Sequence, residues 1–128
     1  MLKKRIMIID DEDVVRRAMG EMFADDYHVE FAKNGSEGLF KMRDNNYDLI
    51  ITDNHMPEMS GVEMLETHSE NKTLEKSTPV IMYTTECNPS FKIRGAEAGV
   101  NYWIIKPFNL LGFYKLVTKI LDQDEVLI

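Results

Sequence analysis

Five short apolar segments alternate with longer amphipathic segments along the chain. Short segments rich in isoleucine are typical of strands that are buried on both faces of a parallel sheet. We expect the strands to begin near Arg5, His28, Asp48, Pro79 and Tyr102. These positions lie 20 to 31 residues apart, which is room for one strand, one helix and two short loops. The alternation predicts an α/β fold with a parallel sheet and right-handed crossovers.

Apolar residues at helical spacing predict five helices. Their expected ranges are Asp13 to Phe23, a segment after Asn34-Gly35, Gly61 to about Asn71, Asn88-Pro89 to Ala98-Gly99, and about Asn109 to Leu121. The residues expected to be buried are Val14, Val15, Ala18, Met19 and Met22 in the first helix, Leu39, Phe40 and Met42 in the second, Val62, Met64 and Leu65 in the third, and Leu110, Phe113, Leu116, Val117 and Ile120 in the fifth. We expect Asp11 or Asp13 to cap the first helix.

The tail from Asp122 to Ile128 is acidic and then apolar. Two interpretations of this tail stay open. It extends the last helix, or it marks the point where a longer parent protein was cut.

The bulk composition predicts one globular domain that covers residues 1–128. The net charge of −7 argues against direct binding to nucleic acid or to an anionic membrane surface. The apolar segments are too short to span a bilayer, and the basic N-terminus lacks the apolar stretch of a signal peptide. Cys87 is the only cysteine, which excludes an intramolecular disulfide. We therefore expect a cytoplasmic protein.

Charged residues follow three of the predicted strands at the point where each strand ends. Asp10-Asp11 follows the first strand, Asp53 the third and Lys106 the fifth. In an open α/β sheet, ligands bind outside the carboxyl ends of the strands. Three acids and one lysine at this edge suggest a site for a divalent metal and a phosphoryl group.

The chain resembles the receiver domains of response regulators over almost its whole length. The residues that carry the resemblance, in order and spacing, are Asp10-Asp11-Glu12, Asp53 with Met56-Pro57 and Gly61, Thr84 after Val80-Ile81-Met82-Tyr83, and Lys106-Pro107-Phe108. The resemblance implies a flavodoxin-like three-layer (βα)5 sandwich with a five-stranded parallel sheet in the order 2-1-3-4-5.

The resemblance also implies a metal-assisted phosphoryl acceptor. Asp53 would be the phosphoacceptor, and its carboxylate would attack the phosphorus of a phosphohistidine. Asp11 and Asp53 would bind Mg²⁺ (or Mn²⁺) directly, Asp10 mostly through water, and the backbone carbonyl of His55 would supply a further ligand. Lys106 would pair with a phosphoryl oxygen.

Further residues are implied to sense the phosphoryl group or to set its lifetime. Thr84 would turn its hydroxyl towards the group, and Trp103 occupies the family's aromatic switch position. The residues expected to influence the lifetime are His55, Thr85 and Glu86. Pro107 is expected to follow a cis peptide bond, as in the family.

A histidine kinase or a histidine phosphotransfer protein would be the donor. The output would be a downstream protein target or a second copy of the chain, bound to the surface of the fourth helix, fifth strand and fifth helix. Candidate contacts on that surface are Phe91, Lys92, Trp103 and Phe113. A receiver accepts and slowly loses its own phosphoryl group, so we do not expect a turnover enzyme.

Three other kinds of protein compete with the receiver interpretation. A small phosphatase of the haloacid dehalogenase type would use Asp11 of Asp11-x-Asp13 as its nucleophile, but it leaves Asp53 unexplained, and Asp122 and Asp124 follow a helix instead of a strand. A flavodoxin that binds flavin would need a loop able to hold a phosphate after the first strand, where the acids repel one. A receiver that has lost phosphorylation conflicts with the complete set of acids, threonine and lysine.

Overall fold

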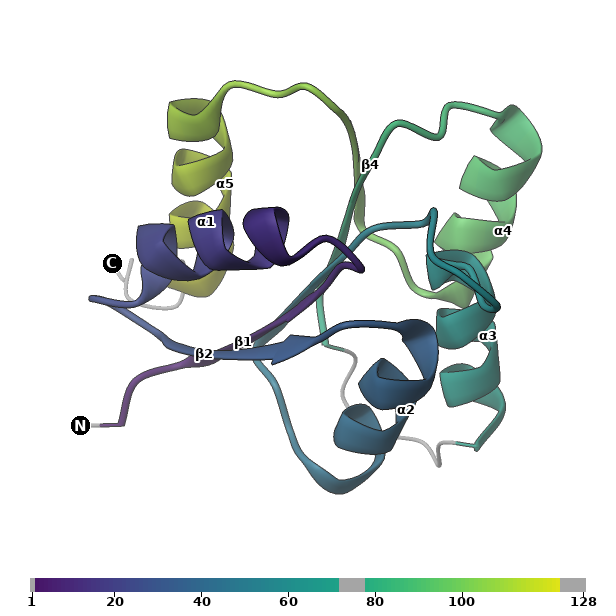
Figure 1. Cartoon of the computed structure of the whole chain (residues 1–128), viewed down its shortest axis with the longest axis horizontal. Coiled ribbons are helices and arrows are strands. Elements are labelled where there is room, and N and C mark those ends of the chain that lie inside the picture. The colour runs from purple at the N-terminus through teal and green to yellow at the C-terminus, as the bar shows by residue number, and fades with distance from the viewer. Residues whose placement is uncertain (1, 72–77, 123–128) are drawn as a thin grey trace, which may run out of the picture.

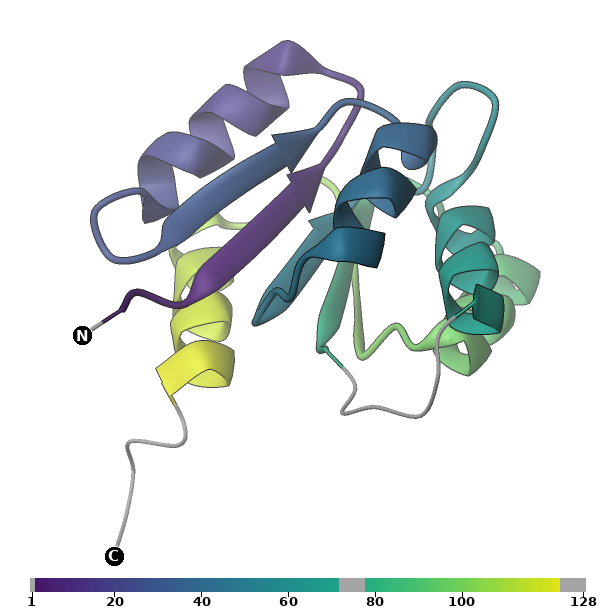
Figure 2. The same cartoon turned by 90° about the horizontal axis from the view of Figure 1, so that it is seen from below.

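The computed structural model describes residues 2–71 and 78–122 and contains a five-stranded sheet with helices on both faces (Figures 1 and 2). The elements are β1 (Arg5–Ile9), α1 (Asp13–Phe23), β2 (His28–Ala32), α2 (Gly35–Asp44), β3 (Leu49–Thr52), α3 (Gly61–Asn71), β4 (Val80–Thr84), α4 (Pro89–Ala98), β5 (Tyr102–Ile105) and α5 (Leu110–Asp122). The strand order is β2-β1-β3-β4-β5, and all neighbouring strands are parallel. The predicted fold class and strand order are confirmed. The tail from residue 123 onward lies outside the described residues.

Two apolar clusters hold the helices on the sheet, one on each face. Side chains alternate between the faces along a strand, so Ile6 and Ile8 join one cluster while Met7 and Ile9 join the other. The first cluster includes side chains of α1 and α5, and the second includes side chains of α2 and α3. Figure 1 shows the same division, with α4 beside α3. In the first cluster, the ring of Phe113 meets that of Tyr83 edge-on at 4.9 Å.

Capping residues mark the ends of several helices. The Asn34 side chain accepts the N–H of Glu37 at the start of α2, and Asn88 caps α4 with Pro89 in its first turn. Gly99 ends α4 in the left-handed conformation, with φ of 112°. The prediction that Asp11 or Asp13 caps α1 is wrong. The N-cap is Glu12, because the turn closes when the Glu12 N–H donates to the carboxylate of Asp10 at 2.9 Å.

The predicted inner faces of three helices need correction. In α1, Val14 and Ala18 are exposed, and the buried residues are Met19, Gly20 and Phe23, so the face is rotated by about one residue, or 100°. The corresponding exposed side chains in the other two helices are Phe40 in α2 and Leu110 in α5. The ring of Phe40 lies instead beneath the guanidinium of Arg43. Leu110 is the first residue of α5, which enters the core one turn later.

A polar network ties the edge strand β2 to the start of β1 and to the residue Tyr47 that precedes β3. The Glu30 carboxylate accepts hydrogen bonds from Arg5 at 2.5 Å and from the Tyr47 hydroxyl at 2.7 Å, and it lies 3.0 Å from His28 Nε2. Burial of Glu30 disfavours its ionised form, but the three partners outweigh burial and lower its pKa to about 2.

Within residues 2–71 and 78–122, no helix combines the length and the apolar character needed to cross a membrane.

Gly61 lies where α3 approaches the end of β3 most closely. A Cβ atom at Gly61 would be 2.3 Å from the backbone carbonyl oxygen of Asp53. Because this neighbour is backbone, a side chain at position 61 forces the loop and the helix apart.

Substituting Gly61→Ala should therefore destabilise the protein by about 1–3 kcal/mol, the usual range for overpacking. Urea unfolding followed by circular dichroism measures the change. Gly112→Ala in α5 is the matched control, because its nearest contact is an ordinary 3.4 Å to Phe108 and alanine favours the helix. Equal stability of Gly61→Ala and wild type would contradict the prediction.

Replacing Glu30 with Gln should lower the free energy of unfolding at neutral pH, by on the order of 2 kcal/mol. An acid whose pKa is lower in the folded state stabilises the fold above its unfolded pKa, and this contribution is lost as the pH falls towards the folded pKa. The difference between wild type and variant should be complete above about pH 5 and shrink from 4.5 towards 2. Urea titrations at several pH values test this. The exposed Glu97→Gln serves as control, and a pH-independent loss in Glu30→Gln would refute the mechanism.

Candidate functional site

Three carboxylates meet at the carboxyl ends of β1 and β3. The two strands are neighbours, with Ile9 opposite Thr52, so Asp10 and Asp53 follow at the same level of the sheet. Oxygen atoms of Asp10, Asp11 and Asp53 all lie within 4.8 Å of one another. Asp10 and Asp53 are buried, at 3% and 7% exposure, and Asp11 is exposed. Clustered carboxylate oxygens are the ligands that hard divalent cations such as Mg²⁺ prefer, so this donor set fits such an ion.

The Asp10 carboxylate is held between the start of α1 and Lys106. One oxygen accepts the Glu12 N–H at 2.9 Å, and the other lies 3.4 Å from Lys106 Nζ. Burial raises the pKa of Asp10, and the negative charge of Asp53 adds to this, while the Glu12 N–H and Lys106 act in the opposite direction. The net shift is upward, so the charged form of Asp10 depends on the hydrogen bond from Glu12 and on the nearby positive charge of Lys106.

Lys106, which follows β5 directly, places its positive charge beside the same carboxylates. Its Nζ is 3.4 Å from Asp10 Oδ2 and 3.4 Å from Asp53 Oδ2, long for a hydrogen bond but within ion-pair distance. Burial lowers the pKa of Lys106, but the two carboxylates outweigh this and the net shift is upward. The lysine is thus protonated at neutral pH. The peptide bond to Pro107 is cis, as predicted.

Hydrogen bonds fix the orientation of Asp53 from several directions. Its backbone N–H donates to Ile9 O at 2.9 Å, and its carbonyl accepts the Thr52 hydroxyl at 2.9 Å. Its Oδ1 accepts the backbone N–H groups of Asn54 at 2.6 Å and His55 at 3.2 Å. These donors leave Oδ2 facing Lys106.

Thr84 and Glu86 lie in the stretch that leads from β4 to α4. The Thr84 side chain is fully buried, and its hydroxyl accepts the Glu86 N–H at 3.2 Å. The Glu86 carboxylate accepts the Asn88 N–H at 2.9 Å and lies 3.5 Å from His55 Nε2. The pair of His55 and Glu86 therefore links the loop after Asp53 to the loop after Thr84. Thr85, between Thr84 and Glu86, is exposed.

Trp103 is half-buried between β5 and α4. Its indole N–H donates to the backbone carbonyl of Glu86 at 2.8 Å. A Cβ atom at Gly95 would lie 2.9 Å from the indole ring, so the ring lies directly against α4. Trp103 thus contacts both the loop and the helix that follow Thr84.

One predicted surface contact is wrong. Phe113 is fully buried in the core between α5 and the sheet, so it cannot contact a partner. Lys92 is exposed and Phe91 is partly exposed, so the prediction that they contact a partner stays open. The large apolar side chains that are exposed on α4 and β5 are Ile93, Tyr102 and Ile105.

The geometry does not favour the phosphatase alternative. That reading needs Asp13 beside Asp11, but Asp13 lies in the first turn of α1, is 66% exposed, and pairs with Arg16 at 3.1 Å and Arg17 at 2.8 Å. Asp122 accepts the Tyr27 hydroxyl at the far end of α5. Asp124 lies outside the described residues.

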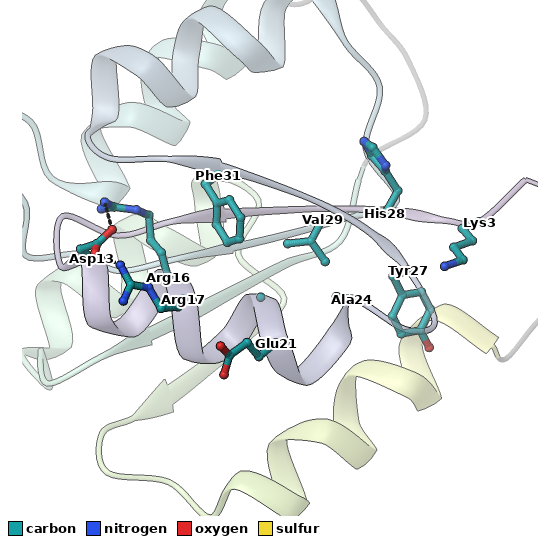
Figure 3. A pocket seen from close by; sticks show the side chains of 11 residues that line it. Lys3, Asp13, Arg16, Arg17, Glu21, Ala24, Tyr27, His28, Val29 and Phe31 are labelled. Atoms are coloured by element: carbon teal, nitrogen blue, oxygen red, sulfur yellow. Dashed lines mark hydrogen bonds and ion pairs between the residues drawn. The ribbon is translucent and has the colours of Figure 1, made fainter.

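A groove of about 610 Å³ lies between α1 and β2 (Figure 3). Phe31, Val29 and Tyr27 form its apolar side, and Arg16 and Arg17 belong to its polar side. In the described part of the chain, the acidic cluster contributes no residue to this lining. This groove is therefore separate from the site that the convergent charges define.

Sequence reasoning missed Asn54, which is 1% exposed and follows Asp53 directly. Its side-chain oxygen accepts the Val62 N–H at 3.0 Å. The pattern Ser60-x-x-Glu63, a capping box, marks the start of α3 and was also available in the sequence. The capping box marks where α3 begins, but it does not reveal that Asn54 contacts Val62.

Comparisons with known proteins agree with this geometry. The family model described as the response regulator receiver domain matches residues 6–121. The chain is 36% identical over 107 residues to the transcriptional regulatory protein ResD of Bacillus subtilis, covering 82% of this chain and 42% of ResD. It is 32% identical over 120 residues to the response regulator ArlR of Staphylococcus haemolyticus, covering 93% of this chain and 53% of ArlR. The chain thus spans about half the length of the curated relatives it matches.

Solved structures give the same result. A CheY-like receiver domain protein from Methanospirillum hungatei has a TM-score of 0.86 and 28% identity, with 96% of this chain and 97% of that chain covered. The response regulator TrrA from Thermotoga maritima, in complex with Mg²⁺ and BeF, has a TM-score of 0.76 and 31% identity, with 92% and 99% covered. The chain belongs to the response regulator receiver domain family of two-component signalling.

Proposed function

We propose that Asp53 accepts a phosphoryl group from a phosphohistidine and that the chain acts as a switch rather than as a turnover enzyme. The observation that carries the proposal is the orientation of Asp53, whose Oδ1 is held by two backbone N–H groups while Oδ2 faces Lys106. In the transfer, a P–O bond to Asp53 forms, the P–N bond of the donor breaks, and the electron pair stays on the imidazole nitrogen. Lys106 pairs with a phosphoryl oxygen and limits the growth of negative charge.

Asp10, Asp11 and Asp53, with the backbone carbonyl of His55, would hold Mg²⁺ (or Mn²⁺). The donor set supports this because three carboxylates converge within 4.8 Å and repel one another. Two unit charges at about 4 Å interact by about 4 kcal/mol at an effective dielectric of about 20. When bound, the ion supplies the positive charge that lets an anionic phosphoryl group approach the acids.

Thr84 would be the first residue outside the acidic cluster to change conformation on phosphorylation. Its hydroxyl, which now accepts the Glu86 N–H, would turn to the phosphoryl group, and Trp103 would respond through its contact with Glu86. The surface of α4, β5 and α5 would then bind a downstream protein or a second copy. His55 and Glu86, which pair across the loops after Asp53 and Thr84, and the exposed Thr85 beside Glu86 would set the phosphoryl lifetime.

The donor would be a histidine kinase or a histidine phosphotransfer protein in the cytoplasm, acting on one receiver domain that covers residues 1–128. Support comes from the family and from relatives that are named as transcriptional regulators and response regulators.

Incubation of the protein with a small-molecule phosphodonor and Mg²⁺ should add one phosphoryl group, and peptide mass spectrometry should locate it on Asp53. Asp53→Asn should abolish the modification, since the amide is not a competent nucleophile. An unmodified Asp53 in the wild type would overturn the proposal. Steady hydrolysis of a phosphatase substrate by Asp53→Asn, lost in Asp11→Asn, would establish the phosphatase instead.

Mg²⁺ should stabilise the folded protein, because the ion relieves the repulsion between carboxylates that come together only in the fold. The gain is about 1.4 kcal/mol when the free ion is at ten times its Kd. Thermal unfolding with and without MgCl₂ measures the effect. Asp11→Asn should lose most of it, whereas Glu12→Gln, an adjacent exposed change outside the cluster, should keep it. An equal gain in both variants would place the ion elsewhere.

A further inference from the structure

Asn54 is a buried polar residue whose hydrogen bonds join Asp53 to the start of α3. Its side-chain Oδ1 accepts the Val62 N–H at 3.0 Å, and its backbone carbonyl accepts the Gly61 N–H at 3.0 Å. The side chain is 1% exposed, so water does not compete for this oxygen. A residue with this set of contacts fixes one end of the loop to a helix.

Two different residues supply acceptors to the first turn of α3. The first N–H groups of a helix have no partner within it and need capping. Ser60, directly before the helix, accepts the Glu63 N–H at 3.0 Å, and the Glu63 carboxylate accepts the Ser60 N–H at 2.9 Å. Asn54 caps the neighbouring N–H from eight residues earlier in the chain. The Ser60 cap alone completes the local capping box, so the Asn54 cap has a further consequence.

That consequence is the orientation of the Asp53 carboxylate. The backbone N–H of Asn54 donates to Asp53 Oδ1 at 2.6 Å, and the next N–H, that of His55, donates to the same oxygen at 3.2 Å. Anchoring the Asn54 side chain to α3 fixes the plane of the peptide that carries the first of these donors. Gly61 supports the arrangement, because a Cβ there would be 2.3 Å from the Asp53 carbonyl.

We propose that Asn54 is the positioning residue of the site: by tying the loop to α3, it holds Asp53 Oδ1 on two backbone N–H groups and keeps Oδ2 directed at Lys106. The functional part of this inference rests on the proposed phosphorylation of Asp53. Asn54 touches neither the donor nor a metal ligand through its side chain, and it acts only through Asp53.

The test compares Asn54→Leu, which is similar in size but lacks the acceptor, with Ser60→Ala, which removes a capping bond from the same helix without touching Asp53. At saturating Mg²⁺, the maximal rate of Asp53 phosphorylation by a small-molecule donor should fall about tenfold or more in Asn54→Leu. The donor concentration for half-maximal rate should stay within about twofold, since binding is not altered. Ser60→Ala should keep the wild-type rate. Equal rates in the two variants would overturn the proposal.

Amide hydrogen exchange gives a readout that does not depend on phosphorylation. In the wild type and in Ser60→Ala, the amides of Asn54 and His55 should be as strongly protected as that of Val62. In Asn54→Leu, and in Asn54→Ala if leucine prevents folding, Asn54 and His55 should lose protection while β1 and β3 keep theirs. Fast exchange of Asn54 and His55 in the wild type would refute the anchoring without any variant. If the wild type shows the protection but Asp53 is not phosphorylated, the proposed function fails and the positioning role of Asn54 with it, although the anchoring stands.

Discussion

The concentration of negative charge at one edge of the sheet is the constraint on which the rest of this structure depends. Asp10, Asp11 and Asp53 converge within 4.8 Å because β1 and β3 are adjacent and parallel. Two of these acids are buried, so water screens them poorly. Lys106 lies against both buried acids, yet one cation cannot balance three carboxylates. Net negative charge therefore remains at the carboxyl ends of β1 and β3, and a further cation would neutralise it.

Backbone N–H groups fix the orientation of two of these carboxylates. The N–H groups of Asn54 and His55 hold one oxygen of Asp53, and the N–H of Glu12 holds one oxygen of Asp10. In both cases the donor lies in the loop directly after the strand, so the orientation of the carboxylate follows from the shape of the loop. Interactions of this kind cost little reorganisation when a ligand arrives, because the donors are already in place.

The sequence predicted the parts of the molecule that depend on periodicity and on strand ends. The five strands, the five helices and the meeting of Asp10, Asp11, Asp53 and Lys106 all follow from apolar segments that end in charge. Helix faces were less predictable, since Val14 and Phe40 are apolar but lie on the solvent side. Phe113 was expected both in the core and among the surface contacts, and the structure confirms only its place in the core. Asn54 was not predicted as a site residue because its role depends on a contact with Val62 across a loop. No local sequence pattern specifies that contact.

Helix α4 is the element on which a change at Thr84 would act most easily. Its only fully buried residue is Gly95, and its other apolar contacts with the core come from partly buried side chains. Its other attachments are the partly buried Phe91 and Ala98 on the second apolar cluster, Trp103 packed on Gly95, the pair of Arg94 with Glu66 of α3 at 2.8 Å, and the Glu86 carboxylate on the N–H of Asn88. Glu86 also donates its N–H to Thr84 and accepts the indole N–H of Trp103, so one residue joins the end of β4 to two of the contacts that hold α4. A rotation of the Thr84 hydroxyl would break the first of these bonds. Because only Gly95 of α4 is fully buried, the position of the helix after such a rotation would depend on the remaining contacts.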